Sequence, residues 1–328
     1  MSEVFVNRTD DYYKTISSAT DLMDNELTVS HLFRSGGAFT KSGLPYGEML
    51  AKKLGLREGM NILEVGPGLG DLAESICKGL QDFRYTFVDV SFDAIKYLKS
   101  KFRGSRFSFI VGDFLNEKPG EKFDLIICNE VLADFPAIVN MTLYAPKIRE
   151  GDEDAYYDAV SLVKFYGLAL PKVSNFSYGA VKFLEKARGL LADGGKVFVC
   201  EHSSEKSKRI GVFGHNEYTI DFGKLEKVAG KLKFAKKERG TLTSLLGVKD
   251  KKAVIFYTHP ELKMLYNFLK RRGVLLDQKT YEPREAIEML EKNGVSVHGR
   301  NDYAQFLESR AKPLRGITDQ FNYLILET

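Results

Sequence analysis

Short apolar runs alternate with stretches of helical period along the first 200 residues of the chain. A short apolar run predicts a buried strand, and apolar residues recurring at every third or fourth position predict an amphipathic helix. The predicted strands cover residues 61–65, 85–88, 106–111, 123–128 and 196–200. Strands that alternate with helices in this way, joined by right-handed crossovers, are typical of an α/β fold with a doubly wound, mostly parallel, Rossmann-like sheet.

Outside this pattern the chain divides into further regions. The predicted helices lie at 150–165, 177–191, 221–232, 262–271 and 284–292, and further short strands at 254–257 and 321–326. A connection as long as 137–176 inside a compact domain is usually functional. We therefore expect a helical N-terminal lid region at 1–58 and a core at 59–250 with an insertion at about 137–176. A C-terminal extension at 251–328 would end in the closing strand.

The first predicted strand runs directly into a glycine turn, with Gly66, Gly68 and Gly70, and then into a helical pattern. A strand, a glycine turn and a helix form the first half of a nucleotide-binding βαβ unit. The dinucleotide pattern would require a third glycine where Asp71 stands, and that carboxylate would repel a pyrophosphate at the helix N-terminus. With Glu64 before the glycines, the acidic-x-Gly-x-Gly-x-Gly pattern instead favours S-adenosylmethionine, which has a positive centre and no phosphate. An ordinary strand-to-helix turn is the alternative.

Polar side chains at the ends of the following strands complete the predicted cofactor site. Asp89 lies at the tip of the second strand, where an acidic residue can accept both hydroxyl groups of a ribose, although it could also begin the next helix together with Ser91. Asp113 follows the third strand and can accept the exocyclic amine of adenine, while Phe114 offers an apolar wall; a simple turn is the alternative. The remaining predicted cofactor-binding residues are Pro67, Val90 and Asn129, the last of which would hold the methionine moiety.

The fourth predicted strand is followed by two carboxylates, Glu130 and Asp134, at the place where a transferable methyl group would point. A guanidinium acceptor needs a carboxylate that binds it through two hydrogen bonds and leaves a lone pair on one nitrogen. Glu130 is the first candidate for this catalytic role and Asp134 the second. The alternative for Glu130 is an acidic residue that stabilises a helix N-terminus.

Composition narrows the class of protein. Hydrophobic residues make up 44% and charged residues 28% of the chain, as in soluble globular proteins. No apolar run approaches the roughly 18 residues that span a bilayer, and the first residues carry no signal-peptide core. Cys77, Cys128 and Cys200 lie far apart in apolar runs, which favours buried thiols over disulfides or metal ligands. We expect a cytoplasmic protein with no membrane contact and no metal.

The net charge of +4 is unevenly distributed. From Glu201 onward lysine and arginine outnumber aspartate and glutamate by 24 to 17, with basic clusters at 236–239, 249–252 and 270–272. Basic clusters can bind nucleic acid or an acidic partner. Short clusters such as these are also common on solvated helix faces, which is the simpler interpretation.

The residues now described resemble the MidA-type methyltransferases, the family of a mitochondrial complex I assembly factor that methylates an arginine. The resemblance covers roughly residues 35–250. It rests on Ala38-Phe39-Thr40, Tyr46-Gly47-Glu48, Leu63-Glu64-Val65-Gly66-Pro67-Gly68, Asn129-Glu130-Val131-Leu132 with Phe135-Pro136, Tyr218-Thr219-Ile220-Asp221-Phe222, and Gly240 with Leu245-Leu246-Gly247. It implies the class I methyltransferase fold, S-adenosyl-L-methionine as cofactor with S-adenosyl-L-homocysteine as product, and methylation of a protein substrate. It also implies a substrate-facing lid that includes Phe39, Thr40 and Tyr46.

The chain departs from that family at several positions. The acid that follows Asn129-Glu130 is shifted to Asp134, Glu201-His202-Ser203 replaces Asp-Tyr-Gly, and Arg239 replaces a glutamine. Residues 251–316 have no counterpart. Two alternatives therefore stay open. The glycine motif is also similar to that of RNA adenine dimethylases, although Leu132 stands where those enzymes have a base-stacking tyrosine. A cofactor-binding assembly factor without turnover is the third interpretation, and the oligomeric state is left open.

Overall fold

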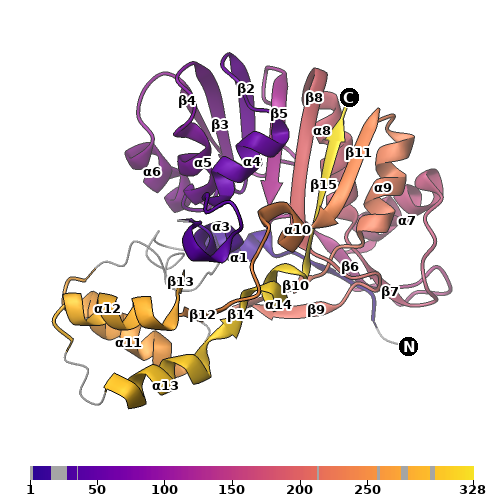
Figure 1. Ribbon diagram of the computed structural model, residues 1–328. Helices are drawn as coiled ribbons and strands as arrows, with labels where there is room; N and C mark the ends of the chain where they lie inside the picture. The colour runs from indigo at the N-terminus through magenta and orange to yellow at the C-terminus, as the bar shows by residue number, and fades with distance from the viewer. Residues whose placement is uncertain are drawn as a thin grey trace.

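The computed structural model describes residues 3–15, 28–34, 36–212, 214–256, 259–274, 280–295 and 300–328. Within these residues a seven-stranded sheet in the order β11-β15-β8-β5-β2-β3-β4 forms the centre of the molecule (Figure 1). Its strands are β2 (Met60–Val65), β3 (Phe83–Asp89), β4 (Phe107–Val111), β5 (Phe123–Asn129), β8 (Leu191–His202), β11 (Lys236–Thr241) and β15 (Phe321–Glu327). Only β15 runs against its neighbours. The predicted doubly wound, mostly parallel sheet is confirmed.

Helices cover both faces of this sheet, because successive side chains of its buried strands point to opposite faces. Leu63 and Val65 of β2 belong to one hydrophobic cluster, and Ile62 between them belongs to the other. The helices on the first face are α7 (Glu153–Tyr166), α8 (Tyr178–Leu190) and α9 (Phe222–Lys231), and those on the second are α4 (Tyr46–Leu54), α5 (Asp71–Cys77), α6 (Phe92–Lys101) and α10 (Leu242–Leu246). The strand order reverses between β2 and β5, which is where sheets of this kind bind ligands.

The N-terminal region contains a strand, which corrects the expectation of a purely helical lid. β1 (Phe5–Asn7) pairs with β6 (Ala137–Met141), and β6 pairs with β7 (Ser174–Phe176). The long connection after β5 therefore provides a small second sheet, and Val4 and Val6 are buried against it. A strand of three residues is too short to show a period in the sequence. The described helices of the region are α1 (Asp10–Thr15), α3 (Val29–Leu32), the single 3₁₀ turn Gly37–Phe39, and α4, whereas the helical prediction for residues 16–27 lies outside the described residues.

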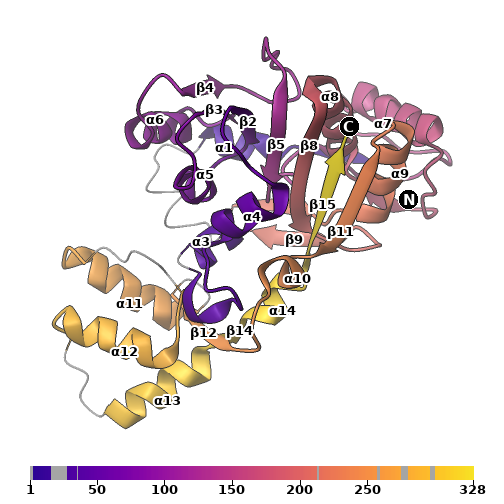
Figure 2. The same ribbon diagram turned by 45° about the horizontal axis from the view of Figure 1, so that its top comes forward.

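Residues 252–313, which we call the inserted lobe, lie between β11 and β15. The lobe comprises β12 (Lys252–Ile255), α11 (Pro260–Arg271), β13 (Thr280–Tyr281), α12 (Pro283–Lys292), α13 (Arg300–Arg310) and β14 (Lys312–Pro313), and α14 (Leu314–Thr318) leads back to the sheet. It has its own hydrophobic cluster. Figures 1 and 2 show it on the side where the parallel strands end. The expected C-terminal extension is therefore an insertion, because β15 returns to the sheet between β8 and β11.

The basic cluster at 236–239 was expected on a helix face and instead lies on β11, the edge strand of the main sheet. Its residues are largely exposed, since β11 covers no core on its outer side. Lysines on an edge strand discourage pairing with another chain. This cluster therefore has a structural explanation that needs no nucleic acid. A hairpin of β9 (Arg209–Val212) and β10 (His215–Tyr218) precedes α9.

Candidate functional site

A cavity of about 310 Å³ opens where β2, β3, β4 and β5 end. Its wall combines the glycine turn with the loops after the other three strands. From the N-terminal region it receives side chains of α1 and of α3 and its flanks, and from the inserted lobe it receives Tyr266 of α11. The predicted site residues that line it are Glu64, Gly66, Pro67, Gly68, Asp89, Val90, Asp113, Phe114, Asn129, Glu130 and Asp134. The structure thus brings together residues from four separate strand ends.

Gly70 is the one predicted cofactor residue that does not line the cavity. Its φ of +71° is a left-handed conformation that favours glycine. A Cβ added there would lie 2.6 Å from the Phe102 ring and 2.7 Å from Leu98. Gly70 is therefore required for close packing of α5 against α6, and not for contact with a ligand.

The other two glycines of the turn face the cavity. Gly66 and Gly68 have φ values of +62° and +52°, so any other residue would be strained at both positions. A Cβ at Gly66 would lie 2.4 Å from Val131, whereas a Cβ at Gly68 would meet no described atom within 4 Å. The space beside Gly68 is therefore open to a ligand that approaches the backbone.

Asp89 and Asp113 both line the cavity while each stabilises its own turn. Asp89 Oδ1 accepts the Ser91 N–H at 2.8 Å, and burial raises the pKa of Asp89 to about 6. Asp113 accepts the Leu115 N–H at 2.9 Å and the Asn116 side-chain amide at 2.6 Å. A carboxylate has about four lone-pair sites, so both groups can still accept hydrogen bonds from a ligand. The turn roles and the predicted binding roles are compatible.

Glu64 is buried at the end of β2 behind the glycine turn. It accepts a hydrogen bond from the Tyr85 hydroxyl at 2.9 Å. Burial raises the pKa of Glu64 to about 8, and the negative charges of Asp71 and Asp89 add to the rise, against the lowering effects of Tyr85 and Lys101. A buried carboxyl group with a strongly raised pKa in a cavity wall is typical of a functional site.

Glu130 lies directly after β5, with a left-handed φ of +58° that is strained for a residue with a side chain. Both of its carboxylate oxygens accept the Val29 N–H at 2.9 Å, so Glu130 fastens the beginning of α3. The Asn129 amide donates to Oε1 at 2.9 Å, and the Tyr46 hydroxyl donates to Asn129 Oδ1 at 2.7 Å. Burial raises the pKa of Glu130 to about 7. The alternative role, an acid at a helix N-terminus, is thus present, although the helix belongs to the N-terminal lid.

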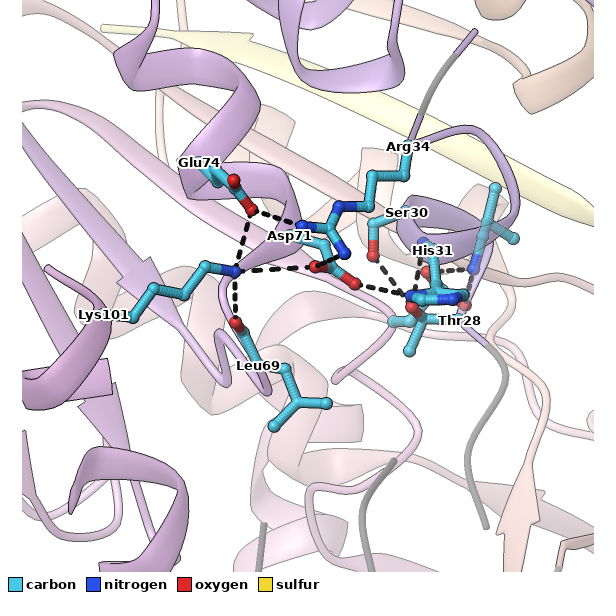
Figure 3. Close-up of polar contacts among 10 residues, drawn as sticks. Thr28, Ser30, His31, Arg34, Leu69, Asp71, Glu74 and Lys101 are labelled. Atoms are coloured by element: carbon cyan, nitrogen blue, oxygen red, sulfur yellow. Dashed lines mark hydrogen bonds and ion pairs between the residues drawn. The ribbon is translucent and has the colours of Figure 1, made fainter. Parts of the chain in front are cut away.

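A network of charged groups holds α3 over the glycine turn. In Figure 3, Asp71 lies between Lys101 and the side chains of His31 and Arg34. His31 Nδ1 lies 2.8 Å from Asp71 Oδ2, and both Arg34 and Lys101 contact Glu74 at 3.0 Å. Although burial alone would raise it, the pKa of Asp71 lies below its ordinary value because of the hydrogen bond and charge of His31 and the charges of Lys101 and Arg34.

His31 and Arg34 line the cavity but were missed in the sequence, because a four-residue helix shows no periodic pattern. Conversely, Phe39 and Thr40 do not line it, which corrects their expected lid positions. Both are buried, and Thr40 pairs with Val248 behind α4. Tyr46 is also buried and reaches the site only through Asn129. The N-terminal side chains that line the cavity next to the glycine turn come from α3 and its flanks.

The family comparison agrees with this geometry. Residues 62–143, from β2 to just beyond β6, match the family model described as a methyltransferase domain. The matched segment is a quarter of the chain and is similar to methyltransferase domains. The sheet order and the helices on both faces are those of the class I methyltransferase fold.

Individual relatives support the same domain. Malonyl-(acyl-carrier protein) O-methyltransferase 2 of Ilyobacter polytropus is 36% identical over 104 residues, which cover 28% of this chain and 40% of that protein. Among solved structures, the [4+2]-cyclase SpnF has a TM-score of 0.52 at 13% identity, and the alignment covers 100% of this chain and 99% of the cyclase. Phosphoethanolamine N-methyltransferase 2 of Haemonchus contortus has a TM-score of 0.50 at 14% identity, over 98% of this chain and 60% of that one.

This chain therefore spans less than two thirds of the curated relative and of the N-methyltransferase that it matches. Among the described residues, no helix combines the length and the apolar character needed to cross a membrane. Two of the cysteines, Cys128 and Cys200, are buried free thiols as expected, whereas Cys77 is partly exposed.

Proposed function

We propose that this protein transfers the methyl group of S-adenosylmethionine to a nitrogen of a cationic acceptor group, with the guanidinium of a protein arginine side chain favoured, and that the nitrogen loses its proton to a carboxylate of the site. The observation that carries the proposal is the acidic end of the cavity, where Glu130 and Asp134 from the segment after β5 both line the wall. In the described part of the chain, no lysine or arginine forms an ion pair with Glu130, Glu201 or Glu217. A cationic acceptor would supply the missing positive charge.

The residues present fit the cofactor. The open space beside Gly68 would receive its methionine part, Asp89 its ribose and Asp113 its adenine amine, each through acceptor sites that the turns leave unused. When bound, the cofactor supplies a methyl group on a positively charged sulfur. Since that sulfur is already a good leaving group, the work of this chain is mainly to orient the acceptor and exclude water.

The chain's own carboxylates would hold the acceptor and receive its proton. Asp134 follows β5 beside Phe135 and Pro136 in the cavity wall, where it can bind a guanidinium. Glu130 has a pKa raised by burial to about 7, which suits a group that takes up a proton near neutral pH. Because Glu130 also holds Val29, the lid and the acceptor site depend on the same side chain.

The proposal is tested by incubating the purified protein with methyl-labelled cofactor and a cell lysate, then hydrolysing any labelled protein to locate methylarginine. We expect Asp134→Asn and Glu130→Gln to lower transfer at least about tenfold while cofactor affinity changes by less than about threefold. Glu205→Gln, an exposed acid outside the cavity, serves as the control variant and should transfer normally. Label in a small molecule, or undiminished transfer by both site variants, would overturn the acceptor assignment.

RNA adenine methylation is a second candidate, favoured by one observation. α11 contributes Tyr266 to the cavity wall, and the same helix ends in Lys270 and Arg271. An RNA substrate would appear as labelled RNA whose binding weakens steeply with salt. The third interpretation, an assembly factor without turnover, predicts cofactor binding with no label in any fraction. It is compatible with a fold that also hosts the cyclase described above.

A further inference from the structure

Three side chains form a second cluster beside the acidic end of the cavity, which we call the Asp134–His215–Glu217 cluster. Asp134 follows β5 and lines the cavity. His215 and Glu217 are alternate residues of β10, so their side chains lie on the same face of that strand. One carboxylate or imidazole atom from each residue lies within 4.8 Å of the other two. Three separate groups that commonly bind metals thus meet at one point.

The distances within the cluster are close to those of a metal site. His215 Nε2 and Glu217 Oε1 are 2.9 Å apart. Two ligand atoms bound at about 2.1 Å to one ion lie roughly 3.0–3.4 Å from each other, so little movement would let an ion enter between them. The Asp134 carboxylate, in the segment after β5, provides the third ligand.

The His215 side chain is buried and fixed in orientation. It is only 5% exposed, and its Nε2 faces Glu217 Oε1, so Nε2 is the ring nitrogen that the cluster offers to an ion. The rings of Tyr12 and Tyr13 pack against the imidazole, with centroids 4.5 and 5.3 Å away, and Tyr13 also lines the cavity. The ring is therefore held in place next to the cavity.

The charges around the cluster also favour a cation. Burial is the main reason that the pKa values of Glu130 and Glu201 are raised, and the negative charge of Glu217 raises both further. The same negative charge also acts on His202, whose pKa is nevertheless lowered by burial. Several buried carboxylates without a matching positive charge are costly in free energy. A divalent cation would neutralise them.

We propose that the Asp134–His215–Glu217 cluster binds a divalent transition-metal ion such as Zn²⁺ or Mn²⁺. One imidazole and two carboxylates form a mixed nitrogen and oxygen ligand set, which suits these ions better than Mg²⁺ or Ca²⁺, since the latter prefer oxygen alone. The sequence did not predict a metal, because His215 and Glu217 are distant from Asp134 along the chain. With Asp134 bound to the ion, Glu130 would be the carboxylate left in the cavity wall to hold the acceptor of the proposed function.

The test uses the full chain after removal of metals with a chelator, without cofactor or acceptor, so its outcome is independent of the proposed function. Zn²⁺ is titrated by calorimetry, and Mn²⁺ by the loss of the free-ion signal in electron paramagnetic resonance. We expect one ion per chain, at least about tenfold weaker binding by His215→Leu and Glu217→Gln, and unchanged binding by the neighbouring control His202→Gln.

Glu217→Gln keeps the shape of the side chain and one hydrogen-bond acceptor, so it tests the site even where His215→Leu does not fold. The proposal is overturned if the wild-type chain binds neither ion below about 1 mM, or if Glu217→Gln binds both as tightly as the wild type does.

Discussion

Replacing Asp89 by asparagine should weaken cofactor binding and, at the same time, stabilise the protein that has no cofactor bound. The change keeps an oxygen that can accept the Ser91 N–H, which Asp89 Oδ1 accepts at 2.8 Å. It removes the negative charge that we expect to hold the ribose. The local turn should therefore survive, and two separate measurements should move in opposite directions.

The affinity for S-adenosylmethionine should fall. Each hydrogen bond from a hydroxyl to a charged carboxylate contributes about 1.5–3 kcal/mol, and asparagine retains one neutral acceptor. We therefore expect a loss of about 2–4 kcal/mol, which is roughly a 30- to 700-fold rise in Kd at 1.4 kcal/mol per tenfold.

The stability of the empty protein should instead rise. Burial raises the pKa of Asp89 from its ordinary 3.8 to about 6, and two pKa units correspond to about 3 kcal/mol. Because Asp89 borders the cavity, solvent screens part of this penalty, and we expect Asp89→Asn to raise the free energy of unfolding by about 1–3 kcal/mol. For an acid whose folded pKa is raised, the penalty is fully present above pH 6 and disappears as the pH falls from 6 towards 3.8. The advantage of Asp89→Asn should therefore be largest at pH 8.

Calorimetric titration with the cofactor measures the first effect, and urea unfolding of the empty protein at pH 8 and pH 5 measures the second. Asp93→Asn, the same change in the first turn of the adjacent helix α6, is the control and should leave the affinity unchanged. The reasoning is refuted if Asp89→Asn binds the cofactor within about twofold of the wild type. It is equally refuted if the variant is the less stable protein at pH 8.

Three further changes test the lid and the buried carboxyl groups. His31→Ala removes the 2.8 Å contact with Asp71 and should weaken cofactor binding about three- to tenfold by calorimetry; equal affinity would show that α3 does not close the site. Tyr46→Phe leaves Asn129 Oδ1 without its donor and should lower the free energy of unfolding by about 1–3 kcal/mol in urea, and an unchanged value would contradict the 2.7 Å bond. Burial raises the pKa of Glu64 from its ordinary 4.5 to about 8, so Glu64→Gln should stabilise the empty protein most above pH 8, and this advantage should shrink as the pH falls from 8 towards 4.5. Thermal denaturation between pH 9 and pH 5 checks this decline, and a variant less stable at pH 9 than the wild type would exclude the reasoning.

The parallel strands were predictable because strands buried on both faces form continuous apolar runs. β2 and β5 were found to within one residue for this reason. β11 was missed, since an edge strand rich in exposed lysine has no apolar run. The three-residue β1 was missed because its partner β6 is far along the chain. Local pattern thus predicts elements that are buried on both sides, and fails where distant pairing forms the element.

The same distinction applies to the site. Glu64, Gly66 and Gly68 are close together in the sequence, and their spacing alone indicated a cofactor turn. His31 and Arg34 reach the same cavity from a short helix, and their positions depend on contacts with α5 and α6 that no local pattern contains. Gly70 is the opposite case. Its spacing fits the cofactor motif, whereas in the structure it allows the turn to pack closely against α6.

The carboxyl groups around the cavity suggest why these separate segments meet there. Burial raises the pKa of Glu64, Asp89, Glu130 and Glu201, so the empty site is least stable when all four are ionised. A ligand with a positive centre recovers that energy, and its affinity should therefore increase as these groups lose their protons. The charge that makes the site unfavourable when empty is thus one that favours a sulfonium cofactor over a phosphate-bearing nucleotide. Substitutions of Glu64 or Asp89 that stabilise the empty protein should therefore weaken binding of the cofactor.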